Sequence, residues 1–183
     1  MAIIDFSNLN SFLLNESHFI KPFDCGDEDL NSFLFNKAIL YKKELLATTF
    51  IIENQERTIA YYTLFNDCLR VEETNFTSKS SIKRFLRTFI SHPKRHLTSF
   101  PAIKIGRLAI DESFKGKGLG RLIINTITHN AINTNNYQAC KFITVDAYHT
   151  SLIFYERLGF KYLSENDQYE DTRQMYLDLT NLV

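Results

Sequence analysis

The chain has 183 residues, of which 44% are hydrophobic and 23% are charged, and its 21 basic residues balance its 21 acidic residues. This length and composition are typical of one folded domain, which we expect to span residues 1–183, and they argue against a disordered or fibrous chain. No apolar run approaches the roughly 18 residues of a membrane span, the first residues lack the basic region of a secretory signal, and the three cysteines are scattered. We therefore expect a cytoplasmic protein with no membrane segment and no disulfide framework.

The basic residues are distributed unevenly along the chain. Residues 74–110 contain eight basic and no acidic residues, which leaves 13 basic against 21 acidic residues elsewhere. In a protein of zero net charge, such a segment predicts either a local anionic partner or a basic helix surface exposed to solvent.

In chain order, the first half predicts a helix, a hairpin and a second helix. Asp27 is typical of a helix N-cap, and apolar residues at helical spacing follow it as far as Tyr41. Two β-rich runs at 47–53 and 57–66 flank a short polar turn and predict an antiparallel hairpin. Residues 78–90 predict a helix with its basic residues outward. Its apolar positions, which we expect to face inward, are Ile82, Phe85, Leu86 and Phe89.

The second half alternates between strands and helices. Residues 102–110 form a near-continuous apolar run, which is typical of a buried strand, and a glycine-rich turn follows it. Next come a predicted helix, a second buried strand, a short helix and a closing antiparallel pair of strands. These elements are residues 118–132, 140–148, 149–160, 160–165 and 172–180. The order predicts an α/β domain with a mixed sheet and one parallel crossover around the turn.

The glycine-rich turn has neither the glycine spacing of a P-loop nor that of a dinucleotide-binding loop. Glycines that lead directly into a helix leave several N–H groups without intrahelical partners, and no Cβ blocks an approach to them. The positive end of the helix dipole lies at the same place. The pattern therefore favours a diphosphate site with basic side chains at its rim, although a tight strand–helix connection would use the same glycines. The turn consists of Lys115, Gly116, Lys117, Gly118, Leu119, Gly120 and Arg121.

Residues 105–127 resemble motif A of the Gcn5-related N-acetyltransferase (GNAT) superfamily, in which a strand leads through Gln/Arg-x-x-Gly-x-Gly/Ala into a helix. Lys115 stands here in place of Gln or Arg. Residues 151–163 resemble motif B of the same family, whose pattern is Phe-Tyr-x-x-x-Gly-Phe. The matching residues are Phe154, Tyr155, Gly159 and Phe160. The resemblance covers roughly residues 48–179 in element order, and it implies the GNAT fold, a mostly antiparallel sheet with one splayed parallel pair of strands.

The resemblance also implies an activity, the acetyl-CoA-dependent N-acetylation of a primary amine by direct attack in a ternary complex. The pyrophosphate would be held by backbone N–H groups of residues 115–121. The pantetheine would lie between the parallel strands, against the backbone of Leu108, Ala109 and Ile110. The Leu108 N–H is the candidate oxyanion donor. Gly106 would permit a bulge in this strand, or alternatively close packing against it.

By the same resemblance, Tyr155 is the candidate general acid that protonates the departing thiolate, with Phe154 beside it against the cofactor. The alternative is that Tyr155 only packs over the cofactor. The general base stays open, since a water molecule or any of several side chains would serve. These side chains are Glu72, Glu73, Asp146, His149 and Glu156. His92 and His96 have zinc-like spacing, but a proline lies between them and no third ligand follows, so no metal is predicted.

The family does not determine the acceptor. Residues 23–34 resemble the N-terminal signature of a branch of toxin acetyltransferases that modify aminoacyl-tRNA. That branch implies a ribbon-helix-helix antitoxin as partner and a homodimer, and the basic segment 74–110 would contact tRNA phosphates. The alternatives are a protein or small-molecule amine as acceptor, and a non-catalytic acyl-CoA-binding module. Against the tRNA interpretation, the net charge is zero, and the phenylalanines of the basic segment would suit a core or a dimer face. They are Phe76, Phe85, Phe89 and Phe100.

Overall fold

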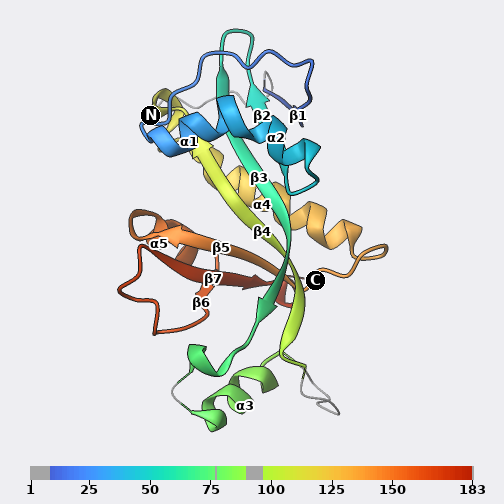
Figure 1. Cartoon of the computed structure of the whole chain (residues 1–183), viewed down its shortest axis with the longest axis vertical. Helices are drawn as coiled ribbons and strands as arrows, with labels where there is room; N and C mark the ends of the chain where they lie inside the picture. The colour runs from blue at the N-terminus through green and yellow to red at the C-terminus, as the bar shows by residue number, and fades with distance from the viewer. Residues whose placement is uncertain (1–8, 77, 90–96, 183) are drawn as a thin grey trace. The chain divides into compact units, whose positions relative to one another are not determined.

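The computed structural model describes residues 9–76, 78–89 and 97–182 (Figure 1). The chain divides into two compact units. The first unit contains the residues up to Phe65 together with Ile105–Ile127, and the second contains Asn66–Lys104 together with the residues from Thr128 onward.

Within the described residues, seven strands are hydrogen-bonded in the order β1-β2-β3-β4-β5-β7-β6. The neighbours β1–β2, β2–β3, β5–β7 and β6–β7 are antiparallel. β4 and β5 are the parallel pair, and α4 (Leu119–Thr134) connects them. The prediction of a mixed sheet with one parallel crossover is therefore confirmed. The strands are β1 (Asn10–Leu13), β2 (Thr48–Glu53), β3 (Thr58–Arg70), β4 (Ser99–Ile110), β5 (Phe142–Tyr148), β6 (Lys161–Tyr162) and β7 (Thr172–Asp178).

In the first unit, the predicted N-terminal helix forms as α1 (Glu28–Ser32), a π-helical turn (Phe33–Lys37) and α2 (Ala38–Lys43). Asp27 caps it as predicted, because its side chain accepts a hydrogen bond from the Leu30 N–H at 3.1 Å. The helices cross the strands of the β2–β3 hairpin (Figure 1) and close a core over them. Its buried members are Leu14, Phe23, Cys25, Phe33, Leu34, Ala38, Ile51, Tyr61 and Ala109.

In the second unit, α3 (Lys79–Arg87) forms where the sequence predicts a helix. A capping box starts it, since the side chains of Ser78 and Ser81 each accept from the other's backbone N–H. The four predicted inward residues pack on a core that β5 and β7 also line. The buried members of this core are Leu69, Val71, Leu86, Phe100, Ala102, Phe142, Leu163 and Tyr176. Of the two roles considered for the phenylalanines of residues 74–110, a core or a dimer face, packing on the core is observed.

The structure differs from the sequence prediction at three strands. β1 was not predicted, because it has only four residues and they are mostly exposed, although Phe12 packs against the core. β3 continues to Arg70, beyond the predicted end of the hairpin. β4 is not buried throughout: its burial largely alternates, with Ile105 and Ala109 buried and Gly106 exposed. No helix within the described residues is long and apolar enough to cross a membrane.

Candidate functional site

The glycine turn has a backbone that only glycine adopts readily. Gly116 has φ +72° and Gly118 has φ +86°, both in the left-handed region, whereas Gly120 already belongs to α4. Among the described residues, apart from the glycine and its chain neighbours, no heavy atom lies within 4 Å of the position that a Cβ would take at Gly116 or Gly118. The two glycines therefore leave the main chain open on this side.

The turn also leaves its N–H groups unpaired. The first intrahelical hydrogen bond of α4 runs from the Leu122 N–H to the Gly118 carbonyl, at 3.2 Å. The N–H groups of residues 119–121, in the first turn of the helix, consequently have no intrahelical acceptor. In the part of the chain that the structure describes, those of residues 116–118 donate to no other group either. Up to six consecutive amides are thus available to an anion at the positive end of a 16-residue helix.

The basic side chains of the turn are less available than the amides. The Lys115 Nζ donates to the Cys25 carbonyl at 2.6 Å, and the Lys117 Nζ donates to the Ser113 carbonyl at 2.7 Å. Arg121 is exposed. The basic side chains at the rim therefore include two lysines whose ammonium groups donate to backbone carbonyls beside the turn.

Before the turn, β4 presents its last residues alternately on its two sides. Ala109 is buried in the core of the first unit, whereas Leu108 and Ile110 are half-buried on the other side of the strand. The Asp111 N–H ends this segment by donating to the Ile59 carbonyl of β3 at 2.8 Å. At Gly106, a Cβ would lie only 2.0 Å from the Phe65 ring, so the close-packing role of this glycine is observed.

In the second unit, Tyr155 lies in α5 (Leu152–Glu156), and the residue is 5% exposed. Phe154 and Phe160 pack edge-on against it at centroid distances of 5.0 and 5.2 Å. Burial raises the pKa of Tyr155 above its ordinary value, because a phenolate would be poorly solvated there. Within the described residues its hydroxyl has no hydrogen-bond partner, yet no buried side-chain oxygen among them is unpaired. The hydroxyl oxygen therefore retains some exposure to solvent.

The candidate general bases whose side chains the structure describes are exposed, and some of them interact with other groups. Asp146 forms an ion pair with Lys104, and His149 Nε2 lies 2.7 Å from the Glu170 carbonyl, to which it donates. Glu72 and Glu156 are exposed. The side chain of Glu73 lies outside the described residues, and so do His92 and His96. Among the residues that are described, no group of three or more His, Cys, Asp or Glu could hold a metal ion.

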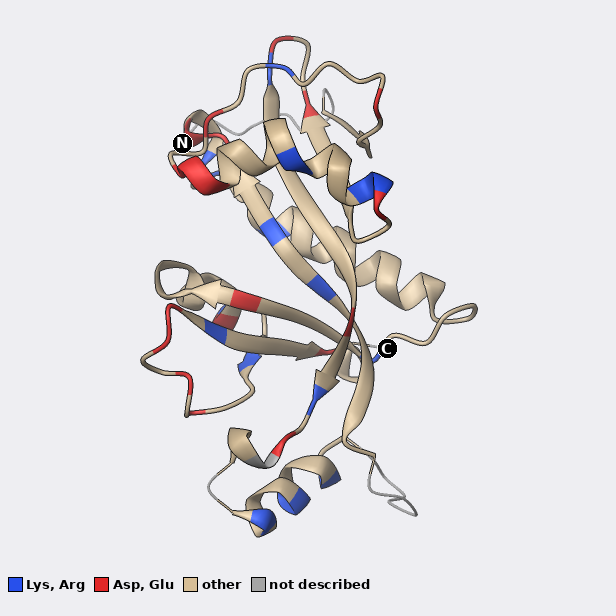
Figure 2. Cartoon of the chain, viewed as in Figure 1, with Lys and Arg blue, Asp and Glu red and all other residues tan. Residues whose placement is uncertain are grey.

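The basic segment contributes charges from β4 and from α3. Lys104 is paired with Asp146, and the Arg107 guanidinium lies 3.7 Å from the centroid of the Phe33 ring, within cation–π range. The basic residues of α3 gather on this helix (Figure 2), where they are exposed. They are Lys79, Lys83, Arg84 and Arg87. Lys94 and Arg95 lie outside the described residues.

Sequence reasoning missed Asp111, which links the glycine turn to two other segments of the first unit. Its carboxylate is buried and accepts from Arg57, Ser113 and the Asp24 N–H. An acidic residue two positions before a serine, at the end of a predicted strand, is a local pattern for a side-chain-to-backbone turn and would have indicated part of this arrangement. The contacts with Arg57 and Asp24 could not be predicted from a short stretch of sequence, because these residues are distant from Asp111 along the chain.

Comparison with known proteins agrees with the fold and the motifs. Residues 89–175 match a family model described as an acetyltransferase (GNAT) domain. The chain is 23% identical to a tyrosine-to-phenylalanine mutant of KacT, with a TM-score of 0.75 and coverage of 96% of this chain and 97% of that chain.

Two structures of AtaT are also similar. One is AtaT complexed with acetyl-methionyl-tRNAfMet (23% identity, TM-score 0.74, coverage 95% of this chain and 96% of that chain). The other is an AtaT mutant toxin bound to the C-terminus of the antitoxin AtaR and acetyl-CoA (21%, 0.72, 96% of each chain). Residues 89–175 thus match the GNAT acetyltransferase domain, and the chain shares its fold with the KacT and AtaT structures.

Proposed function

We propose that the two units act as one acetyltransferase domain, which transfers an acetyl group from acetyl-CoA to a primary amine in a ternary complex. The observation that carries this proposal is the run of unpaired amides at residues 116–121, open on its glycine side and within the segment that matches the acetyltransferase model. A diphosphate fits this turn, because its oxygens accept hydrogen bonds from consecutive N–H groups and its charge is favoured by the helix dipole.

The end of β4 would supply the remaining backbone contacts to acetyl-CoA. The main-chain groups of Leu108, Ala109 and Ile110 would hydrogen-bond the amides of the pantetheine arm. The Leu108 N–H would stabilise the carbonyl oxygen of the thioester as that oxygen gains negative charge. Phe154 would pack against the cofactor.

Acetyl-CoA supplies an activated acetyl group as a thioester. The amine nitrogen bonds to the carbonyl carbon, the carbon–sulfur bond breaks, and the thiolate takes a proton from Tyr155. The proton that the amine loses passes to water or to one of the exposed carboxylates or His149. Since Tyr155 has a raised pKa, its proton must move in step with the breaking of the carbon–sulfur bond rather than before it.

For the acceptor, we propose the amino group of an aminoacyl-tRNA. The exposed basic face of α3 supports this choice, because it offers phosphate contacts that a small amine does not need. The similar structures include AtaT complexed with acetyl-methionyl-tRNAfMet and an AtaT mutant toxin bound to the C-terminus of the antitoxin AtaR, and they favour the same acceptor. We accordingly propose a toxin of the cytoplasm, which acts as a homodimer and is paired with a ribbon-helix-helix antitoxin.

The test is transfer of labelled acetyl from acetyl-CoA to total charged tRNA, with the same tRNA after deacylation as the control. We expect label on charged tRNA only, and growth arrest when the chain is expressed. A Lys83→Gln, Arg84→Gln, Arg87→Gln variant should raise KM for charged tRNA and flatten its salt dependence, with acetyl-CoA affinity unchanged.

Other outcomes separate the alternatives. Label on a peptide or polyamine but not on charged tRNA would identify a different amine as the acceptor. Binding of acetyl-CoA without transfer to any amine would favour a non-catalytic acyl-CoA-binding module. Light scattering of the purified chain tests the homodimer, and a neighbouring gene for a ribbon-helix-helix protein would support the antitoxin.

A further inference from the structure

The segment Asp24–Gly26 lies against the residues that lead into the glycine turn. The Glu112 N–H donates to the Asp24 carbonyl at 2.9 Å, and the Lys115 Nζ donates to the Cys25 carbonyl at 2.6 Å. Gly26 has φ +76°, and a Cβ there would lie 2.3 Å from Glu112 Oε1. Each of the three residues therefore contacts the segment 111–115, within one unit of the chain.

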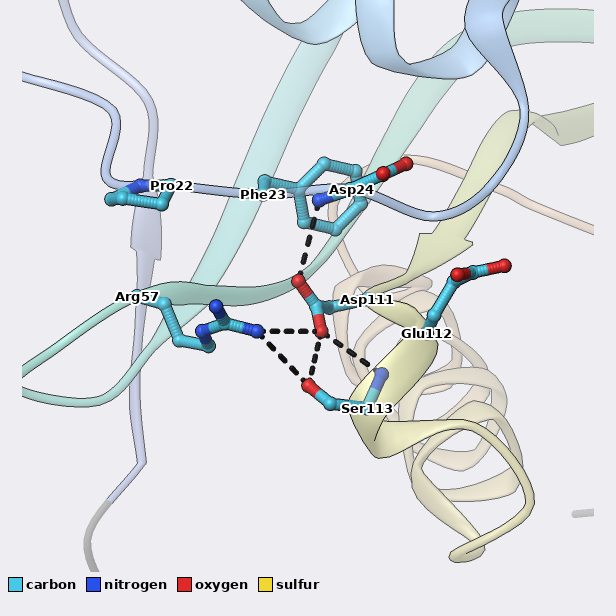
Figure 3. A pocket seen from close by; sticks show the side chains of 7 residues that line it. All are labelled: Pro22, Phe23, Asp24, Arg57, Asp111, Glu112 and Ser113. Atoms are coloured by element: carbon cyan, nitrogen blue, oxygen red, sulfur yellow. Dashed lines mark hydrogen bonds and ion pairs between the residues drawn. The ribbon is translucent and has the colours of Figure 1, made fainter.

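Asp111 is the centre of this contact (Figure 3). One carboxylate oxygen accepts from Arg57 Nη1 at 3.0 Å, from the Ser113 N–H at 3.1 Å and from the Ser113 hydroxyl. The other accepts from the Asp24 N–H at 3.3 Å. The side chain of Asp111 is 4% exposed, whereas Arg57 is 39% exposed and reaches it from the β2–β3 turn. One buried carboxylate thus joins three segments that are distant in sequence.

The carboxylate is ionised in this arrangement. Burial acts to raise the pKa of Asp111, but hydrogen bonds from Ser113 and from the Asp24 N–H, together with the Arg57 guanidinium, hold the pKa below its ordinary value. The pocket of about 320 Å³ beside it is lined by Asp24, Asp111 and Glu112 against a single arginine. This surplus of carboxylates makes the pocket a poor place for a phosphate, so the role of Asp111 is to hold the chain rather than to bind the anion.

We infer that Asp111, clamped by Arg57 and Asp24–Gly26, is a positioning residue that holds the glycine turn in its anion-binding conformation before acetyl-CoA arrives. This inference rests on the proposed function, since it assumes that the turn binds the pyrophosphate. It also gives a physical role to the start of the 23–34 signature, whose residues 24–26 make the contact, whereas Asp27 only caps α1.

The contact around Asp111 should affect the affinity of the chain for acetyl-CoA. Six amides converge on an anion only when the segment 115–121 keeps one backbone conformation, and glycines at 116 and 118 would otherwise let that segment sample many. A preorganised turn avoids the entropy of ordering at the moment of binding. Loosening the clamp should therefore weaken acetyl-CoA binding while the rate of transfer at saturating acetyl-CoA is retained.

Asp178 provides a matched control for Asp111. It also caps a short 3-10 turn (Leu179–Asn181), accepting from the Thr180 N–H at 3.0 Å and from its hydroxyl at 2.6 Å. It also pairs with a cation, Lys141, at 3.2 Å, and its side chain is only 9% exposed. It lies in the second unit, whereas the glycine turn lies in the first. Asp111→Asn and Asp178→Asn therefore remove the same local chemistry at two places.

The experiment measures the dissociation constant of acetyl-CoA by calorimetry for the full chain and these two variants, with Arg57→Gln as a milder second variant. We expect Asp111→Asn to weaken binding about tenfold, Arg57→Gln to weaken it less, and Asp178→Asn to change it less than about twofold. Hydrogen exchange without acetyl-CoA should be faster at residues 22–31 and 111–115 in Asp111→Asn, less so in Arg57→Gln, and unchanged in Asp178→Asn. The transfer rate at saturating acetyl-CoA should match that of the wild type in all three variants.

Each result has a distinct meaning. Equal affinities in Asp111→Asn and Asp178→Asn would overturn the inference and leave the proposed function intact. If Asp111→Asn failed to fold, unchanged affinity and exchange in Arg57→Gln would overturn it in the same way. Failure of the wild type to bind acetyl-CoA would instead overturn the proposed function, and the inference with it.

Discussion

The glycine turn and the Tyr155 segment carry the two family motifs, but they are opposite in construction. Residues 116–121 present unpaired main-chain amides, with open space where side chains would stand at Gly116 and Gly118. Tyr155 is a side chain packed by Phe154 and Phe160, and its acidity is set by that packing. The first region would bind through main-chain N–H groups that have no partner among the described residues, whereas the second would act through a buried side chain. A binding defect and a rate defect should therefore separate cleanly between them.

Tyr155→Phe should give the largest effect. Without the phenolic proton the thiolate leaves unprotonated, so we expect kcat to fall about 100-fold with the dissociation constant of acetyl-CoA unchanged. Single-turnover transfer and calorimetry measure the two quantities. Tyr176→Phe is the control, because Tyr176 is a buried tyrosine of the same unit whose pKa burial raises to about 12. An unchanged kcat in Tyr155→Phe would remove the general-acid assignment.

Gly118→Ala should produce the complementary defect. The left-handed φ of +86° costs a residue with a Cβ about 1–2 kcal/mol, which lowers the population of the binding conformation and weakens acetyl-CoA binding about 5- to 30-fold. Gly159→Ala is the control, with φ +89° and only ordinary van der Waals contact at 3.5 Å. It should lose similar stability in thermal unfolding and keep its acetyl-CoA affinity. Equal affinity in the two variants would show that the turn is only a connection.

Ser78→Ala tests the start of α3, where the Ser78 side chain caps the helix. Ser78 accepts from the Ser81 N–H at 3.2 Å, whereas the start of α4 has a glycine, which offers no capping side chain. Losing this cap should lower the free energy of unfolding by about 1 kcal/mol, or the melting temperature by about 2–4 °C. Acetyl-CoA affinity should not change. A fall in affinity as large as that of Gly118→Ala would mean that any helix start affects binding.

The smallest expected effect concerns pH, since we expect ionisation of Tyr155 to leave the kcat of the wild type unchanged. Because burial places the pKa of Tyr155 above the ordinary tyrosine value, its phenol stays protonated from pH 7 to about pH 10. The kcat of the wild type at saturating substrates should therefore show no descending limb in this range. A descending limb near pH 8 that disappears in Tyr155→Phe would show that the tyrosine ionises more easily than its packing implies.

By itself, the sequence determined the order of the elements after β1, the Asp27 cap and the place of the glycine turn. The cap and the turn depend on neighbours within a few residues: Asp27 bonds to Leu30, and the glycines of 116–120 precede an apolar helix. Hydrophobic periods of two and 3.6 residues are also local, which is why the hairpin and the long helices were predicted.

Only the tertiary structure decided which groups are available for binding and catalysis. The lysines of the turn meet carbonyls, Arg107 lies on Phe33, and β1 gains its place by pairing with β2, none of which a short window of sequence contains. Asp111 shows this most clearly, because its partners Asp24 and Arg57 come from distant parts of the chain. Local patterns specify elements, since backbone conformation depends on near neighbours, but burial and pairing across elements specify the site.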